Sequence, residues 1–199
     1  MSSLIDPDLH RRNFRTVFAL AGLFLLPLLL SFWLYYGLHW RPQAMSNHGE
    51  LIEPVRQLPE VPLAAADGGA QHHIFQGHWT LVYVGGGACD AHCRETLFFM
   101  RQTRLSLNNE MSRVQRVFLA TANCCDREYL AAEHPGLRVL DASPAAARPL
   151  LAQFQAADRA QTLFVVDPLG NLMMRYDARL PPKGLLEDLK RLLQLSHIG

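Results

Sequence analysis

Two cysteines separated by three residues, Cys89 and Cys93, are the side chains of this sequence best suited to chemistry. They lie in the stretch YVGGGACDAHC, where an apolar run ends in three glycines and a helical pattern begins. Glycines let the backbone turn sharply, and the free N–H groups of a helix N-terminus stabilise a thiolate. If the helix begins at Cys89, both sulfurs lie on one face, close enough to form a disulfide or to bind one soft metal ion. The alternative is a plain stabilising disulfide.

Cys124 and Cys125 form a second pair, directly after the apolar run at residues 114–122. The carboxyl ends of neighbouring parallel strands face one crevice, so this pair is expected to approach Cys89 and Cys93 and to supply a further ligand of the metal ion or a resolving thiol. A bridge between adjacent cysteines is strained, so cross-pairings between the two pairs are the expected form if all four are oxidised. The alternative is one buried and one incidental thiol.

Several other side chains are candidate ligands or proton donors of lower specificity. His92 lies between the two thiols, although a histidine in an exposed first turn is commonly only solvated. The entry segment before the first apolar run offers three more imidazoles, and a late strand offers two thioethers, of which at least one is expected to pack in the core. These residues are His72, His73, His78, Met173 and Met174. The sequence shows no Walker loop, catalytic triad or zinc spacing.

The elements that position these side chains follow an alternating pattern of apolar strand-like runs and helix-like runs. The predicted strands are residues 80–85, 114–122, 137–142, 162–167 and 172–177, and the predicted helices are 90–111, 126–133, 143–155 and 183–195. Continuous apolar strands separated by helices indicate a sheet covered on both faces. The turn at 168–171 predicts an antiparallel hairpin between the last two strands. The order βαβαβαββα is that of a thioredoxin-like, three-layer α/β domain with a central mixed sheet, over residues 72–199, although the pattern alone leaves other α/β topologies open.

An apolar segment at residues 16–38 contains no side chain that is charged at neutral pH. About 20 such residues span the hydrocarbon core of a bilayer. No A-x-A-like cleavage site follows, so an anchor is favoured over a cleaved signal peptide. Arginines at 11, 12 and 15 precede the segment, whereas Arg41 alone follows it closely. The positive-inside rule therefore predicts a cytoplasmic tail at residues 1–15 and a single-pass protein of the bacterial inner membrane, with its C-terminal domain on the periplasmic side.

Residues 39–71 carry four prolines and no sustained period, which predicts an extended linker with one short strand at 49–52. The whole chain has 19 basic and 18 acidic side chains, with a formal net charge of +1. Such a balance lacks the basic excess that proteins use to bind a phosphate backbone, so nucleic acid is excluded as a partner.

Taken together, these features resemble the SCO/SenC family of membrane-anchored, thioredoxin-fold cytochrome c oxidase assembly factors. The resemblance is carried by the anchor, the CxxxC of Cys89 and Cys93, the apolar strand at 162–166 and the DPLGN turn after it. Thioredoxins, in contrast, carry CxxC. The resemblance implies that Cys89 and Cys93 bind and deliver Cu(I), or reduce the cysteines of an oxidase copper site. It also implies a cytochrome c oxidase subunit or another assembly factor as partner.

The sequence departs from this family at the distal histidine that completes its copper site. Counting back from the DPLGN turn, that position falls near Arg159, and no histidine occurs between His134 and His197. The guanidinium of Arg159 stays protonated and does not ligate metals. If it lies over Cys89 and Cys93, its charge would instead stabilise their thiolates. Gln161 replaces the proline that precedes the corresponding strand in thioredoxins. Three functions stay open: Cu(I) delivery, a membrane-anchored thiol–disulfide oxidoreductase of the cytochrome maturation type, and a non-catalytic assembly scaffold.

Overall fold

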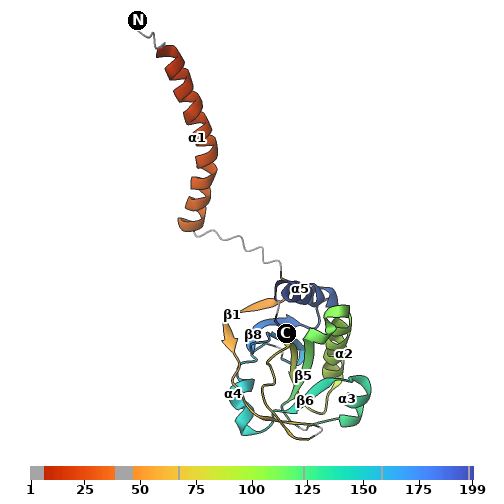
Figure 1. Cartoon of the computed structure of the whole chain (residues 1–199). Coiled ribbons are helices and arrows are strands. Elements are labelled where there is room, and N and C mark those ends of the chain that lie inside the picture. Colours follow the sequence, from red (N-terminus) through yellow and green to blue (C-terminus); the bar gives the residue numbers. More distant parts are fainter. Residues whose placement is uncertain (1–6, 39–46, 67, 123, 158, 197) are drawn as a thin grey trace. The chain divides into compact units, whose positions relative to one another are not determined.

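The computed structural model describes residues 7–38, 47–66, 68–122, 124–157, 159–196 and 198–199. The chain divides into two compact units, Met1–Met45 and Ser46–Gly199. The first unit contains helix α1 (Pro7–Tyr36), drawn in red and orange in Figure 1. Its segment Phe14–Tyr36 is long and apolar enough to cross a membrane, and none of it is buried inside the protein. The protein therefore has one N-terminal apolar helix of membrane-spanning length.

The second unit is built on a mixed sheet, which confirms the predicted α/β class. In the described part of the chain the sheet has eight strands in the order β1-β8-β7-β4-β5-β6-β2-β3. Their bounds are β1 (Glu50–Gln57), β2 (Leu63–Ala65), β3 (Ala70–Gln71), β4 (Trp79–Gly85), β5 (Val114–Ala120), β6 (Leu137–Asp141), β7 (Thr162–Val166) and β8 (Asn171–Asp177). The central strands β4, β5 and β6 are parallel, and the remaining pairings are antiparallel.

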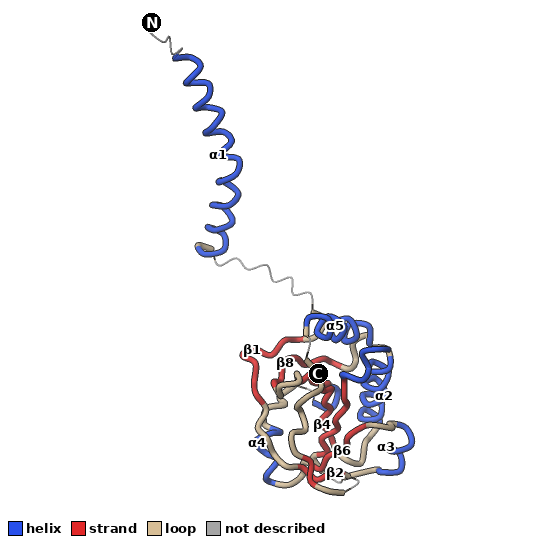
Figure 2. The backbone as a smooth tube through the Cα atoms, viewed as in Figure 1, coloured by secondary structure: helices blue, strands red, loops and turns tan. Residues whose placement is uncertain are grey.

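Helices cover both faces of this sheet. Figure 2 shows α2 (Ala91–Leu105) and α3 (Arg127–Glu133) on the opposite side from α4 (Arg148–Leu151), while α5 (Pro182–Leu195) joins the first group. An apolar cluster lies on each face of the sheet, and the side chains of β4 alternate between the two. Leu81 and Tyr83 belong to the cluster that includes α2 and α5, whereas Val82 and Val84 belong to the cluster that includes α4. A strand buried on both faces reads as a continuous apolar run, and this explains why β4 could be recognised from the sequence.

Two predicted helices are shorter in the structure. Residues 143–155 form a 3-10 turn, η2 (Ala145–Ala147), followed by the single turn of α4. Pro149 has no N–H to donate to the preceding turn, so a continuous helix cannot form there. The predicted helix at 90–111 ends at Leu105 and continues as the 3-10 segment η1 (Asn108–Arg113).

The predicted linker at residues 39–71 differs most from the structure. Residues 39–46 lie outside the described residues, but β1 pairs with β8, and β2 pairs with both β6 and β3. The structure therefore assigns residues 50–71 to the folded unit rather than to a tether. The side chains of β1 are mostly exposed because it is an edge strand. The short strand predicted at 49–52 corresponds to the first part of β1, and the rest of this edge strand has no buried face and therefore no apolar period to detect.

The predicted hairpin at 168–171 is confirmed. Strands β7 and β8 are antiparallel neighbours, and Gly170 N donates to Asp167 O at 3.0 Å. The Asp167 carboxylate accepts from the main-chain N–H groups of Leu169 at 2.9 Å and Asn171 at 2.8 Å. This arrangement is the local side-chain mimicry that makes aspartate favourable at the start of a turn.

Candidate functional site

Cys89 and Cys93 are joined by a disulfide at the start of α2. The S–S distance is 2.04 Å and the Cα atoms are 5.0 Å apart, both within the ordinary range. The helix begins at Ala91, not at Cys89, and Asp90 is its N-cap. Cys89 lies in the preceding loop with a positive φ of 46°. The bridge therefore joins a loop residue to the first turn of the helix, which the i, i+4 spacing also permits.

The Asp90 carboxylate occupies the helix N-terminus beside the two cysteines. Its Oδ1 accepts a hydrogen bond from the main-chain N–H of Cys93 at 2.9 Å. From the sequence, the free N–H groups of the helix N-terminus are expected to stabilise a thiolate. One of these groups, the N–H of Cys93, is already bonded to a capping side chain. A second negative charge at this position also opposes thiolate formation.

The disulfide is enclosed. Cys89 is 2% exposed and Cys93 is 1% exposed, and both belong to the apolar cluster that α2, α5 and the central strands share. Leu97 and Phe118 of the same cluster are fully buried. A protein partner thus has no direct access to these two sulfurs in the oxidised form.

Cys124 and Cys125 are joined to each other, so the expectation of cross-pairing is wrong for this structure. They are half-buried and pack against the same apolar cluster as Cys89 and Cys93. Gly87 fixes both ends of their loop: its N–H donates to Ala122 O at 2.7 Å, and its carbonyl accepts from Asp126 N at 3.1 Å. These two hydrogen bonds hold the main chain on both sides of Cys124 and Cys125 against Gly87. The loop after β5 and the loop after β4 are therefore neighbours, as the parallel pairing of these strands predicts.

Arg94 links the two loops. Its Nε donates to Cys89 O at 3.2 Å, and its Nη2 lies 3.6 Å from the Asp126 carboxylate. The guanidinium also lies 4.3 Å from the ring centroid of Tyr129, a cation–π contact. Sequence reasoning missed all three residues because they are far apart along the chain, and a charged residue in a helix ordinarily indicates a solvated face.

His92 and the turn before β7 meet, but not over the sulfurs. The turn is η3 (Arg159–Gln161), and the Gln161 amide Nε2 donates to His92 Nδ1 at 3.0 Å. Both His92 and Arg159 are exposed. The position of the missing family histidine thus lies in η3, near the first turn of α2. Within η3, Gln161 is the residue that contacts His92.

The remaining sequence candidates lie elsewhere. His72, His73 and His78 are exposed before β4, whereas the cysteines follow its other end. Seven residues of strand place these two ends roughly 20 Å apart. His73 pairs with Glu60 at 2.9 Å. Met174 is 1% exposed and belongs to the core, as expected for at least one of the two methionines.

A copper(I) site is built from soft sulfur ligands, alone or together with imidazoles. In the described ranges no group of three or more His, Cys, Asp or Glu side chains is placed to hold a metal ion. Reduction of the first disulfide would supply two thiolates, which are soft ligands suited to Cu(I). These residues therefore fit a two-coordinate Cu(I) cargo once reduced, and do not reproduce a site completed by histidine.

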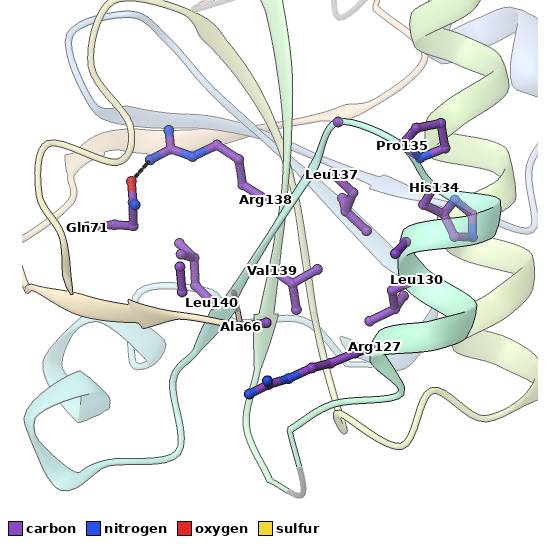
Figure 3. A pocket seen from close by; sticks show the side chains of 13 residues that line it. Ala66, Gln71, Arg127, Leu130, His134, Pro135, Leu137, Arg138, Val139 and Leu140 are labelled. Atoms are coloured by element: carbon purple, nitrogen blue, oxygen red, sulfur yellow. Dashed lines mark hydrogen bonds between the residues drawn. The ribbon is translucent and has the colours of Figure 1, made fainter. Parts of the chain in front are cut away.

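A separate cavity of about 430 Å³ lies beside β6. Figure 3 shows apolar side chains of α3 and β6 in it, and Arg138 hydrogen bonded to Gln71 at one side. His134 also lines it and is 3% exposed, and burial together with the nearby Arg101 and Arg116 lowers the pKa of this histidine to about 4. None of the side chains that line this cavity is a cysteine, so it is distinct from the dithiol site.

Comparison with known proteins supports the fold. Residues 79–196 match the family described as "Transmembrane-like, thioredoxin-like, C-terminal domain". No curated protein matches the chain in sequence.

Solved structures of Sco proteins superimpose on the chain at low identity. Copper-bound ScoI of Bradyrhizobium japonicum is 18% identical with a TM-score of 0.56, over 68% of this chain and 99% of ScoI. Apo Sco1 of Thermus thermophilus is 23% identical with a TM-score of 0.59, over 75% of this chain and 99% of Sco1. BsSco, a member of the Sco family of cytochrome c oxidase assembly proteins with a disulfide switch, is 15% identical with a TM-score of 0.55, over 71% of this chain and 96% of BsSco. The SCO/SenC resemblance drawn from the sequence is thus confirmed at the level of the fold.

Proposed function

Because the chain belongs to the family of transmembrane-like, thioredoxin-like C-terminal domains, we propose that it is a membrane-anchored thiol–disulfide exchange protein of the Sco type. Its substrate is the disulfide form of a cysteine pair that ligates copper in a respiratory oxidase. The reacting groups of this protein are Cys89 and Cys93. The work of the protein is to keep that client pair reduced during oxidase assembly.

One observation carries this proposal: Cys89 and Cys93 are bridged at the start of α2. A cysteine pair bridged between a loop and a helix N-terminus is the arrangement of dithiols that exchange, although here the Asp90 carboxylate occupies the N–H of Cys93. The described residues offer these two sulfurs but no group of three ligands for a metal ion. The bridged pair therefore favours electron transfer over coordination of a metal ion by three ligands.

The exchange is a two-electron reaction. The client disulfide is attacked by a thiolate of this chain, and the mixed disulfide that forms is resolved by a second thiolate of this chain. Cys89 and Cys93 end as a disulfide, and the client receives two electrons and two protons as a dithiol. A protein dithiol must restore the reduced pair, with the same balance in reverse.

The location follows from α1 and the charges before it. The apolar segment Phe14–Tyr36 supports an anchor in a bacterial inner membrane, and the arginines at 11, 12 and 15 support a cytoplasmic tail. The folded unit then acts in the periplasm, an oxidising compartment in which client cysteines need a reductant. BsSco, which shares the fold, is a cytochrome c oxidase assembly protein with a disulfide switch.

Cu(I) delivery is the second candidate, and the gathering of two cysteine pairs at one apolar cluster favours it. When reduced, Cys89 and Cys93 would bind Cu(I) as cargo through both sulfurs. Cys124 or Cys125 would be the nearest source of a further sulfur, and His92 is held by Gln161 instead. ScoI of Bradyrhizobium japonicum, a neighbour in fold, is a structure with copper bound.

The test uses the reduced full chain in lipid nanodiscs and a peptide carrying the copper-ligating cysteines of an oxidase subunit as an intramolecular disulfide. Samples are acid-quenched and alkylated, and the thiols of both partners are counted by mass. The wild type should reduce up to two equivalents of the peptide, whereas Cys89→Ser/Cys93→Ser, which keeps only the second cysteine pair, should reduce at most one. Thr121→Ala, which changes the neighbouring loop but no cysteine, is the matched control and should act as the wild type.

A wild type that leaves the peptide oxidised overturns the exchange proposal. A parallel titration with a Cu(I) chelator of moderate affinity then separates the other functions. Competition that depends on Cys89 and Cys93 supports delivery. Failure in both assays leaves a non-catalytic assembly scaffold, for which binding to an oxidase subunit would have to persist in the cysteine-free variant.

A further inference from the structure

We propose that Cys124 and Cys125 are the exchange port of the buried Cys89–Cys93 pair. A partner protein makes its mixed disulfide with Cys124 or Cys125, and electrons reach Cys89 and Cys93 by exchange inside this chain. The inference rests on the proposed function and adds the route by which partners act on the site.

The first argument is accessibility. Thiol–disulfide exchange requires an in-line approach of one sulfur to another, so a sulfur that a partner cannot touch does not exchange with it. Cys89 and Cys93 are 2% and 1% exposed. Cys124 and Cys125 are half-buried and therefore present surface to solvent. Of the two pairs, the second is the one that a protein partner can reach.

The second argument is proximity. The loop of Cys124 and Cys125 is hydrogen bonded at both ends to Gly87, which precedes Cys89 by two residues. Cys89 N in turn donates to Gly86 O at 3.2 Å, so the chain turns back tightly between Gly87 and the disulfide. All four cysteines contact one apolar cluster. These contacts place the two pairs side by side at the same end of the sheet.

The third argument is charge. Arg94 bonds to Cys89 O on one side and pairs with Asp126, the residue after Cys125, on the other. A cation that contacts the loops of both cysteine pairs favours the thiolate that an exchange step produces in either loop. Asp126 and Tyr129 fix this cation in place, the carboxylate by its charge and the ring by its face.

The fourth argument is space for a partner. An open groove of about 340 Å³ begins at Arg94 and Asp126 and runs along the exposed side of α3. Its remaining lining residues are Glu128, Tyr129, Ala132 and Glu133. The groove carries three carboxylates and one guanidinium, so it fits a partner segment with basic side chains next to its reactive cysteine.

The relay balances in atoms and electrons. A thiolate of a protein dithiol attacks the Cys124–Cys125 bond, and the second thiol of that protein resolves the mixed disulfide and leaves both cysteines as thiols. One of these, as a thiolate, then attacks the Cys89–Cys93 bond, and its neighbour resolves the new mixed disulfide. Cys124 and Cys125 return to a disulfide, and Cys89 and Cys93 hold two electrons and two protons. Reduction of a client disulfide follows the same steps in reverse.

The experiment compares a large and a small reductant on the oxidised full chain in nanodiscs. A thioredoxin-type protein dithiol can reach only exposed sulfurs, whereas a small phosphine can enter during local opening of the loop. The redox state of each pair is followed by alkylation and peptide mass spectrometry. In Cys124→Ser/Cys125→Ser, reduction of Cys89–Cys93 by the protein dithiol should slow by at least roughly tenfold, while reduction by the phosphine stays within about twofold of the wild type.

Two controls keep the result specific. Thr121→Ala perturbs the same loop, through its hydroxyl bond to Gly85 O at 3.2 Å, but keeps both pairs, and its rates should match the wild type. Cys89→Ser/Cys93→Ser should still have its Cys124–Cys125 bond reduced by the protein dithiol. Loss of reduction in this variant as well would overturn the assignment of the port.

The relay intermediate can also be trapped. Four variants, each of which keeps one cysteine of the first pair and one of the second, are oxidised and digested. At least one should form an intramolecular disulfide between the pairs. If none does, or if the protein dithiol reduces Cys89–Cys93 equally fast without Cys124 and Cys125, the port does not exist even though the exchange function stands. If the wild type exchanges with neither protein dithiol nor client peptide, the proposed function itself has failed.

Discussion

Arg94 donates a hydrogen bond from Nε to the carbonyl oxygen of Cys89 at 3.2 Å. A side chain of the first turns of α2 therefore holds the main chain of the residue that carries the loop half of the disulfide. The same guanidinium lies 3.6 Å from Asp126, so its charge is shared between the disulfide loop and the loop of the second cysteine pair. This one cation connects the conformation of the site to its electrostatics.

Replacing Arg94 by Gln should raise the thiol pKa values of the reduced site, because a positive charge that stabilises thiolates is removed. The expected effect is a roughly threefold to tenfold slower reaction with iodoacetamide near neutral pH, since a one-unit pKa change alters the thiolate fraction about tenfold. The rate is measured against pH on the reduced full chain. Lys183→Gln, a charge change at an exposed residue of α5 that pairs with Glu187, is the control and should leave the profile in place. An identical pH profile for Arg94→Gln would contradict the role given to this cation.

Asp90 is expected to act in the opposite direction. Its carboxylate caps α2 and bonds to Cys93 N at 2.9 Å, and its charge disfavours a thiolate beside it. Asp90→Asn keeps an acceptor oxygen for the cap but removes the charge, so the helix should persist while the thiol pKa falls and alkylation speeds up. Asp90→Ala removes both and should in addition cost about 1 kcal/mol of stability. Slower alkylation in the asparagine variant would contradict this reading of the cap.

The elements that could be predicted from the sequence are those that leave a local pattern of side chains. Strand β4 and the turn at Asp167 were predictable, because a doubly buried strand reads as an apolar run and an aspartate turn has its own local signature. Strand β1 was predicted only in its first part, as the short strand at 49–52, since its pairing with β8 buries backbone rather than side chains. Within the site, the residues and spacing of Cys89 and Cys93 were evident, and the bridge between Cys124 and Cys125 was not. Contacts such as that between Arg94 and Asp126 depend on loop geometry that no local pattern encodes.

The membrane orientation is testable by fusion. The three arginines before the apolar segment predict that the end of the chain lies outside the cytoplasm. A reporter that is active only in the periplasm, attached after Gly199, should be active in bacterial cells. Moving the three arginines to the other side of the segment should lower that activity and raise that of a cytoplasmic reporter. Cytoplasmic activity of the unaltered fusion would refute the topology and, with it, the need for a periplasmic reductant.

Asp188 is expected to be a major contributor to the stability of the folded unit. Its carboxylate is 5% exposed and accepts from the main-chain N–H groups of His48 and Gly49, each at 2.8 Å. It thereby fixes the chain that enters β1 onto α5. Asp188→Ala leaves buried donors without partners, which costs about 1–3 kcal/mol, and the loss should appear as a lower midpoint of urea unfolding. Glu187→Ala, its exposed neighbour, should change the unfolding free energy by less than about 1 kcal/mol. Equal effects of the two substitutions would refute the role of the buried carboxylate.

His134 should make the stability of the fold depend on pH. It is 3% exposed and contacts the Tyr129 hydroxyl through Nε2 at 3.3 Å. Its pKa is lowered from 6.5 to about 4, first because burial disfavours the charged ring and then because Arg101 and Arg116 repel it, while Glu133 acts weakly in the other direction. Since the unfolded chain binds this proton more tightly, the contribution is fully present above pH 6.5 and is lost as the pH falls from 6.5 toward 4.

The unfolding free energy of the wild type should therefore fall by about 2 kcal/mol between pH 7 and pH 5 through this residue alone. In His134→Gln, which keeps a polar side chain but cannot titrate, most of that decrease should disappear, although the variant starts from a lower stability at pH 7 because the buried ring contacts are lost. Urea unfolding of the full chain in nanodiscs, followed by near-ultraviolet circular dichroism at the two pH values, measures the difference. His73→Gln is the matched control: this histidine is exposed and pairs only with Glu60 in the described structure, so the pH dependence should stay close to that of the wild type. A His134→Gln variant with the full wild-type decrease would show that another group, and not the buried histidine, takes up the proton on unfolding.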